Sequence, residues 1–159
     1  MPPPWKPSVT VAAVVERDGR FLMIEEETAD GVRVNQPAGH LDPGETLLQA
    51  AAREALEETA HVFTPTALLG VYMARSVSSG EAEAVTYVRF AFTGELGARD
   101  PGRALDHGIL RVLWLTPDEI RARRAEHRSP LVMKCVEDHL AGRRFPLDFV
   151  HAHPSVLLA

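Results

Sequence analysis

The chain has 159 residues, of which 45% are hydrophobic and 25% are charged, and its formal net charge is -5. This composition is typical of one globular domain with its own hydrophobic core. An acidic chain without a long basic stretch matches a nucleic acid backbone poorly, so we expect no nucleic-acid partner. The single cysteine, Cys135, excludes an intramolecular disulfide, and we expect a buried, unreactive thiol.

The ends of the sequence carry no sign of export or membrane insertion. The N-terminal stretch MPPPWKPS lacks the regions of a signal peptide, and no hydrophobic run reaches the roughly 18 residues needed to span a bilayer. We therefore expect a cytoplasmic protein without a membrane partner. Its expected parts are an extended arm at 1–7, one domain at 8–150 and a tail at 151–159.

The first third of the sequence predicts a hairpin followed by a loop. Residues 8–16 are β-branched and hydrophobic, and an Asp-Gly pair at 18–19 provides a turn before a second strand-like run at 20–26. Residues 28–34 contain another Asp-Gly pair and are expected to form a loop. Pro37 keeps the segment before it extended.

Two longer strand-like runs follow the central, glutamate-rich helix. They cover residues 67–77 and 84–96, and a polar loop at 78–83 separates them. Residues 98–108 are expected to form a surface loop, and 109–115 a short strand. These strands predict a second hairpin.

Capping signals predict two helices near the C-terminus. Thr116, Pro117 and Glu119 combine a hydroxyl acceptor, a proline for the first helical position and a glutamate that reaches back. A Ser-Pro pair at 129–130 repeats the signal before a helix at 131–141. The order of elements predicts an α+β domain with helices on both faces of a partly antiparallel sheet.

Three glutamates lie close together on the central helix. At about 100° per residue, Glu54, Glu57 and Glu58 fall within an arc of roughly 100°. Like charges at this spacing repel, and Arg53 is the one local cation that relieves them. One interpretation is a solvated acidic face, and the other is a divalent cation site.

A hard cation such as Mg²⁺, or alternatively Mn²⁺, takes several oxygen ligands and links carboxylates to a phosphorylated substrate. The three glutamates provide such oxygens, and Glu45 stands at the end of the loop before the helix. The glycines of AGHLDPGE indicate unusual torsions or a close approach of the backbone. A main-chain carbonyl there, such as that of Ala38, would then face the same metal.

The spacing of these residues resembles the signature of the Nudix hydrolase family. The matching positions are Gly39, Glu45, Arg53, Glu54, Glu57 and Glu58. The segments NQPAGHL, AAAREALEET, RSPLV and GRRFPLD resemble the NudJ-like phosphatase branch of that family, over nearly the whole chain. The resemblance implies an α/β/α sandwich with a mixed sheet between helices, and a hydrolase that cleaves phosphoanhydrides.

The resemblance also implies roles for single residues. Glu57 and Glu58 correspond to the principal metal-binding pair, Glu54 to a further ligand, and Glu45 to a contributor to a metal or its water. Arg53 corresponds to the arginine that fixes the geometry of the glutamates. The general base is left open, because Glu57, Glu58 or another group would serve.

The sequence departs from the family pattern near the end of the helix. Ala55 and His61 replace residues that are usually aliphatic, and Ala60 replaces a glycine. Ala55 is expected to be harmless. Alanine adopts a left-handed helix cap only at a cost, so we expect the helix to run further or to end differently.

Four polar residues ahead of the helix are candidate substrate contacts: Arg33, Asn35, Gln36 and His40. Residues at strand edges are more often solvated, and a structural hydrogen bond is the alternative for His40. In the loop at 78–83, Glu81 and Glu83 are either solvated or close over the metals.

The expected function is metal-dependent hydrolysis of small phosphoanhydrides by water attack on phosphorus. Resemblance to the NudJ-like branch suggests nucleoside tri- and diphosphates, thiamine pyrophosphate and its hydroxymethylpyrimidine pyrophosphate precursor as substrates. A pyrophosphatase for nucleotide sugars or dinucleotides is one alternative. A non-catalytic nucleotide-binding regulator is another, and the protein is expected to be a monomer or a homodimer.

Overall fold

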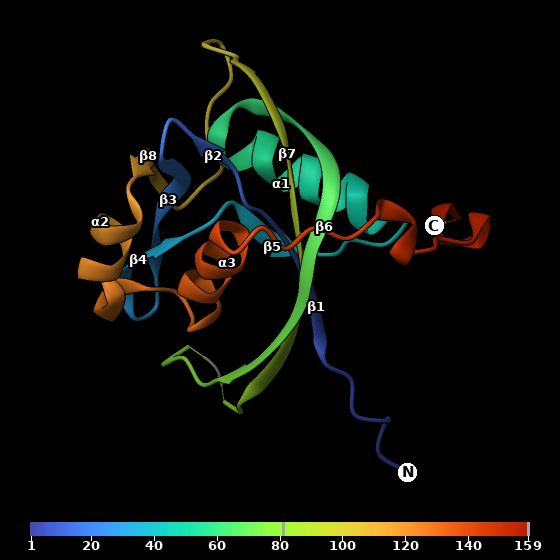
Figure 1. Ribbon diagram of the computed structural model, residues 1–159. Coiled ribbons are helices and arrows are strands. Elements are labelled where there is room, and N and C mark those ends of the chain that lie inside the picture. Colours follow the sequence, from blue (N-terminus) through green and yellow to red (C-terminus); the bar gives the residue numbers. More distant parts are fainter. Residues whose placement is uncertain (81, 159) are drawn as a thin grey trace.

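A computed structural model of the protein describes residues 1–80 and 82–158, in which two four-stranded sheets lie between helices (Figure 1). The strands are β1 (Ser8–Ala13), β2 (Glu16–Arg17), β3 (Arg20–Thr28), β4 (Gly31–Asn35), β5 (Ala38–His40), β6 (His61–Ser76), β7 (Val85–Arg99) and β8 (Ile109–Leu115). The α-helices are α1 (Leu47–Thr59), α2 (Pro117–Ala122) and α3 (Leu131–Leu140), and short 3-10 turns cover 124–126, 147–149 and 154–157.

The first sheet is mixed, and its strand order is β5-β1-β7-β6. Strand β1 pairs in parallel with β7 and antiparallel with β5, while β6 and β7 form a long antiparallel hairpin. In the second sheet, β2, β4 and β8 all pair antiparallel with β3. The short strand β5 therefore places the segment before the glutamate helix at one edge of the mixed sheet.

The hairpin predicted for 8–26 is wrong over most of its length. The Asp-Gly turn at 18–19 forms with positive φ at both residues, but only the two-residue strand β2 pairs across it. The Val14 amide donates to the Phe92 carbonyl in the first sheet, whereas Val15 accepts from Leu22 in the second. The chain thus passes from one sheet to the other between these two valines.

The loop predicted at 28–34 is also wrong, because most of it belongs to a hairpin. Strand β3 continues to Thr28, β4 begins at Gly31, and the two pair in register from Ile24 with Asn35 to Thr28 with Gly31. The Thr28 hydroxyl donates to the Gly31 carbonyl at 2.6 Å and closes the turn. Because this hairpin contains many polar side chains, the sequence predicts a loop where the structure has strands.

Strand β6 begins earlier than predicted and runs through Pro65. Proline cannot donate to a β ladder, and it is tolerated on edge strands and at bulges. Both conditions hold here, since β6 is the edge of its sheet and the register shifts between Pro65 and Ala67. Strand β7 likewise continues to Arg99, so the loop expected at 98–108 is shorter.

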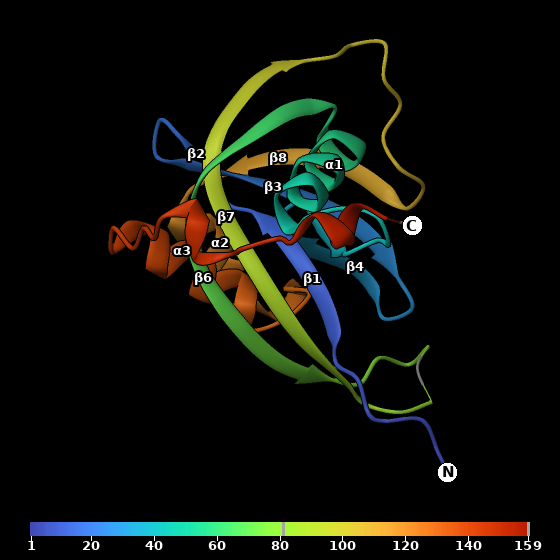
Figure 2. The same cartoon turned by 90° about the vertical axis from the view of Figure 1, so that its right-hand side faces the viewer.

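Two hydrophobic cores lie on opposite faces of the strands, and Figure 2 shows α1 on one side and α2 with α3 on the other. Alternate residues at the end of β1 and just after it contribute to the two cores: Val11 and Ala13 pack with α1, whereas Ala12 and Val14 pack with α3. Such alternation follows from the two-residue period of a strand. The predicted α+β fold with helices on both faces is confirmed.

The helix ends show which capping predictions succeeded. At α2, Thr116 and Glu119 form the predicted capping box, and the α3 helix begins beside Ser129, whose hydroxyl accepts from the Leu131 amide. The central helix does not run on. It ends at Thr59, and Ala60 adopts the left-handed conformation with φ 60°, which an alanine takes only at a cost.

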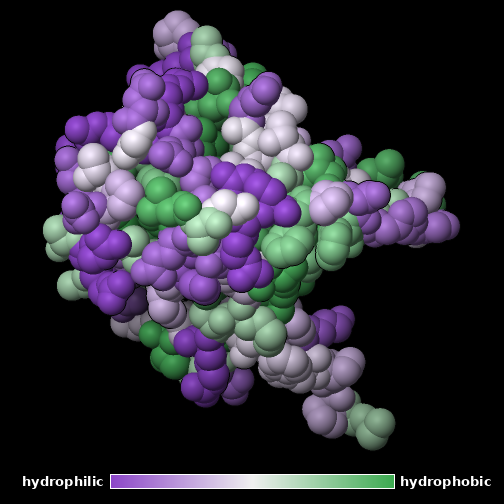
Figure 3. Space-filling view, viewed as in Figure 1, coloured by the Kyte–Doolittle hydropathy of each residue, from purple (hydrophilic) through white to green (hydrophobic). Residues whose placement is uncertain are grey.

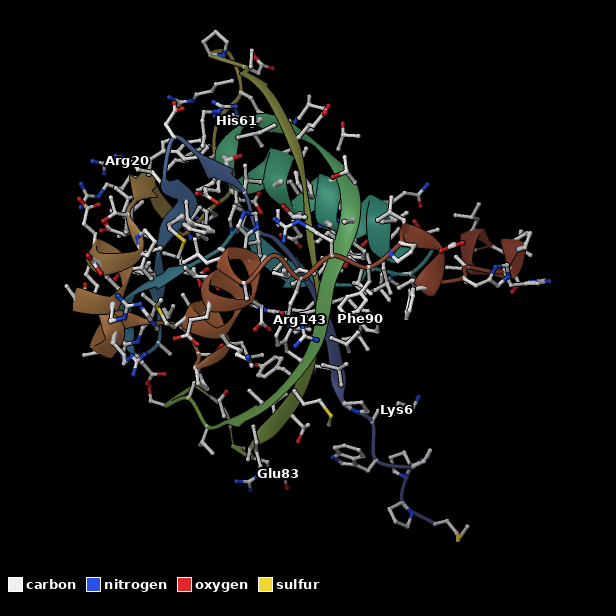
Figure 4. All side chains as sticks on the ribbon, in the orientation of Figure 1. Lys6, Arg20, His61, Glu83, Phe90 and Arg143 are labelled. Atoms are coloured by element: carbon white, nitrogen blue, oxygen red, sulfur yellow. The ribbon has the colours of Figure 1, made fainter. Side chains whose placement is uncertain are left out.

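Both ends of the chain extend from the body. Lys6 lies on the N-terminal arm, away from the sheets, and Glu83 lies at the far end of the β6–β7 hairpin from His61 (Figure 4).

Hydrophobic side chains gather along β6 in Figure 3. Two residues of this strand, Val71 and Met73, are 53% and 66% exposed. No helix in the described part of the chain is long and hydrophobic enough to cross a membrane.

Candidate active site

Arg53 occupies the centre of the glutamate cluster on α1. Its guanidinium donates two hydrogen bonds to Glu45, of 2.9 and 2.7 Å, and single bonds to Glu54 at 2.9 Å and Glu57 at 3.1 Å. It also reaches the His40 carbonyl at 3.0 Å. The planar fork of arginine suits several simultaneous carboxylate contacts. The structure thus brings Arg53 together with Glu57, its neighbour at i,i+4, and also with Glu54 and Glu45.

The arrangement changes the acidity of the groups around Arg53. Hydrogen bonds from the guanidinium lower the pKa of Glu45, and the same bonds raise the pKa of Arg53. At Glu54, burial outweighs the arginine and raises the pKa. Glu45 is therefore held as a carboxylate by Arg53, whereas Glu54 lies where charge is less favourable.

Glu58 points away from Arg53, toward β5. It is 5% exposed, and its carboxylate accepts a hydrogen bond from the Ala38 amide at 2.7 Å. Burial raises the pKa of Glu58 to about 9, and the nearby carboxylates Glu54, Glu26 and Asp106 add to the effect. A buried carboxylate among other carboxylates is destabilised unless a cation or proton joins it.

Gly39 allows the Glu54 carboxylate to lie against the backbone of β5. A Cβ atom at this position would collide with all three carboxyl-group atoms of Glu54. The close approach expected from the glycines before the helix is therefore present at Gly39. The same three-residue strand holds Glu58 through Ala38, so β5 positions two glutamates.

The chemistry of these donors fits a divalent cation, because several carboxylates lie near one another at a partly buried site and Glu58 forms no ion pair in the described part of the chain. In the described residues, however, no three acidic, histidine or cysteine side chains converge as a ready metal cluster. Glu54 and Glu57 are turned toward Arg53, and Glu58 toward Ala38. Glu57 has the most exposed side chain of the three, at 28%.

A cavity of about 270 Å³ opens beside this cluster. Three of the four candidate substrate residues line it, namely Arg33, Asn35 and His40, and so do Ala38 and Gly39. Arg33 comes from β4, and the His40 ring lies 6.1 Å from that of Tyr87 on β7. The cavity thus extends from the backbone of β5 toward strands β3, β4 and β7.

Gln36 does not line the cavity, so the structure gives it no contact with a bound substrate. It is completely buried, its amide donates to the Val132 carbonyl at 2.8 Å, and its side-chain oxygen accepts from Arg89 at 2.9 Å. Its role in the described structure is to connect α3 with β7. Gln36 follows the end of β4 and meets Asn35 at the same Arg89 guanidinium, so no local signal in the sequence separated these two residues.

Sequence reasoning missed four residues near the site. Glu26, Arg89 and Arg128 line the cavity, and Asp106 lies close enough to the helix to raise the pKa of Glu54 and Glu58. These residues come from β3, β7 and two loops, and no motif joins them. Of the two loop glutamates, Glu83 is exposed and outside the cavity lining, and Glu81 lies outside the described residues.

Replacing Arg53 by lysine is expected to lower kcat about 10-fold, because one ammonium cannot hold three glutamates in the geometry of the guanidinium. Turnover at saturating metal measures this effect. Arg111→Lys is the matched control, since Arg111 also holds a glutamate, Glu25, with two bonds but lies outside the cavity lining. Equal losses in both variants would contradict a specific positioning role for Arg53.

Comparison with known proteins identifies the family. The NUDIX domain model matches residues 4–135. Phosphatase NudJ from Escherichia coli (strain K12) is 36% identical over 146 residues, which cover 92% of both chains, and the NudJ of Shigella boydii gives the same values.

Solved structures agree with the sequence relatives. A NUDIX hydrolase from Nitrosomonas europaea shares 50% identity with a TM-score of 0.87, covering 93% of this chain and 98% of that one. A MutT NUDIX hydrolase from Burkholderia pseudomallei, at 20% identity, has a TM-score of 0.67 over 84% of this chain and 98% of that one, and shares the fold. The chain belongs to the Nudix family as a NudJ-like hydrolase that acts on phosphoanhydrides.

Proposed function

We propose that this hydrolase removes phosphate, with Mg²⁺ or alternatively Mn²⁺, from nucleoside tri- and diphosphates, thiamine pyrophosphate and its hydroxymethylpyrimidine pyrophosphate precursor. The observation that carries the metal requirement is Glu58, a buried carboxylate near Glu54 that has no cationic partner among the described residues. The substrate class rests on similarity to relatives named as phosphatases. A cytoplasmic location goes with substrates of this kind.

The proposed metal ligands are Glu54, Glu57 and Glu58, with the Ala38 carbonyl and Glu45 as further contributors. When bound, the cation would neutralise phosphate charge and make its water more acidic. Arg53 fixes the positions of Glu45, Glu54 and Glu57 through its hydrogen bonds. A glutamate of the cluster would accept the proton of the attacking water, with Glu57 and Glu58 as the candidates.

The alternative substrates, nucleotide sugars and dinucleotides, are separated from this proposal by the products of turnover. The test measures orthophosphate and pyrophosphate released from GTP, GDP, thiamine pyrophosphate, ADP-ribose and a dinucleoside polyphosphate, each with Mg²⁺, Mn²⁺ or chelator. We expect metal-dependent orthophosphate release from the first three compounds. Cleavage confined to ADP-ribose or the dinucleotide would overturn the proposed substrates, and full turnover in chelator would overturn the proposed metal requirement.

A further inference from the structure

Arg89 on β7 is a buried cation that forms no ion pair in the described part of the chain. Its side chain faces the cavity, yet the residue is only 5% exposed. The guanidinium donates to the side-chain oxygens of Asn35 and Gln36, both at 2.9 Å, and contacts the Cys135 sulfur at 3.8 Å. All three partners are neutral groups, and within residues 1–80 and 82–158 no ion pair joins Arg89 to a carboxylate.

A buried charge of this kind is costly unless an opposite charge or a full set of hydrogen bonds compensates it. Arginine carries five N–H groups. The three contacts of Arg89 use both hydrogens of Nη1 and one of Nη2, which leaves the Nε–H and one Nη2–H without a partner in the described structure. The side chain therefore has both the charge and the donors to bind a further group.

Further positively charged side chains line the rest of the cavity. Arg33 and Arg128 also line it, and of its two carboxylates, Glu26 and Asp30, each already has a partner. Asp30 accepts two bonds from Ser79, of 2.6 and 3.1 Å, while Glu26 forms an ion pair with Arg128 at 3.6 Å. Burial raises the pKa of Glu26, and the charges of Arg128 and Arg89 oppose this rise, although Arg89 forms no ion pair with Glu26. Within the described residues neither Arg33 nor Arg89 forms an ion pair, and of these two arginines only Arg89 is buried.

The position of Arg89 relates the cavity to the glutamate cluster. Its partners Asn35 and Gln36 immediately precede the segment that leads into β5, whose residues Ala38 and Gly39 hold Glu58 and Glu54. Because neutral amides fix the guanidinium without neutralising it, Arg89 is preorganised for an anion. A substrate with two charged groups would then bind one group at the glutamate cluster and the other at Arg89.

We propose that Arg89 binds a phosphate group of the substrate that extends from the glutamate cluster into the cavity. This inference rests on the proposed function, since it assumes a substrate with linked phosphates. It adds a residue outside the family signature to the binding site. The predicted ligand chemistry is a phosphate oxygen that accepts from the Nε–H and the remaining Nη2–H.

The first test uses the wild-type protein without turnover. Inorganic phosphate is added in chelator while the arginine Nε–H signals are followed by NMR, with Arg89 assigned through bonds to its backbone amide. We expect a saturable shift of the Arg89 signal and none for Arg121, which lies outside the cavity lining. A shift caused by the neutral nucleoside cytidine and not by phosphate would overturn the proposal in favour of a ring carbonyl.

The second test separates binding from chemistry. Arg89→Lys keeps a positive charge but loses the paired donors, so KM should rise about 10- to 100-fold while kcat changes little. Arg121→Gln is the control for loss of a surface arginine. An unchanged KM in a folded Arg89→Lys variant, or no phosphate-dependent NMR shift, would overturn the assignment. Because the NMR test needs neither metal nor turnover, its failure is distinguishable from failure of the proposed function.

Discussion

Glu58→Gln is expected to lower kcat by at least about 100-fold and, in the absence of metal, to make the protein more stable. The loss of activity follows from the proposed role of Glu58 as a metal ligand and candidate base. The amide still has an oxygen that accepts from the Ala38 amide, so the hydrogen bond of 2.7 Å to β5 is kept. The substitution therefore removes the charge without removing the contact.

The gain in stability has a definite pH dependence. Because burial raises the pKa of Glu58 to about 9, its proton is bound more tightly in the folded than in the unfolded protein. This contribution is present below the usual pKa of about 4.5 and is lost as the pH rises toward about 9. Glutamine has no ionised form, so the stability of the variant relative to the wild type should increase as the pH rises through this range.

Thermal unfolding in chelator at several pH values measures this difference. The melting temperature of Glu58→Gln should exceed that of the wild type by a margin that widens between pH 5 and pH 9, and added Mg²⁺ should reverse the order by stabilising only the wild type. Glu95→Gln, at an exposed position on β7, is the control. A variant less stable than the wild type at pH 9 in chelator would contradict the account of Glu58.

Local signals in the sequence were sufficient for the helices and the glutamate cluster. The capping box of Thr116 and Glu119 acts over three residues, and Arg53 lies within one helical turn of Glu54 and Glu57. Spacing along a helix fixes which side chains meet, because the period of 3.6 residues is constant. Helix spacing therefore accounts for the contacts of Arg53 with Glu54 and Glu57, whereas its contact with Glu45 depends on the loop before the helix.

Strand pairing depends on contacts that the local pattern does not specify. The turn at 18–19 was predicted correctly, yet β1 pairs with β7, whose residue Val88 lies opposite Val9. The alternation of a strand shows which residues share a face, but not which distant strand becomes its neighbour. The cavity has the same origin, because Glu26, Arg89 and Arg128 meet only once β3, β7 and the loop before α3 are assembled.

Gly39→Ala is expected to reduce kcat about 100-fold with little loss of stability. Replacing a closely packed glycine usually lowers stability instead. The three atoms nearest to the added Cβ all belong to the end of the flexible Glu54 side chain. Glu54 can turn aside, so the fold survives. The displacement of one carboxylate by about 1 Å in an assembled active site is enough for a loss of this size.

The comparison that tests this argument is Gly39→Ala against Gly94→Ala and Gly97→Ala. At Gly94 the new Cβ would collide with the Thr64 backbone, so that variant should unfold at a lower temperature, whereas at Gly97 it would make an ordinary contact 3.5 Å from the Val62 carbonyl. Only Gly39→Ala should combine a near-normal melting temperature with low turnover. If it retained normal turnover, the close contact of Gly39 with Glu54 would not be what positions that carboxylate for catalysis.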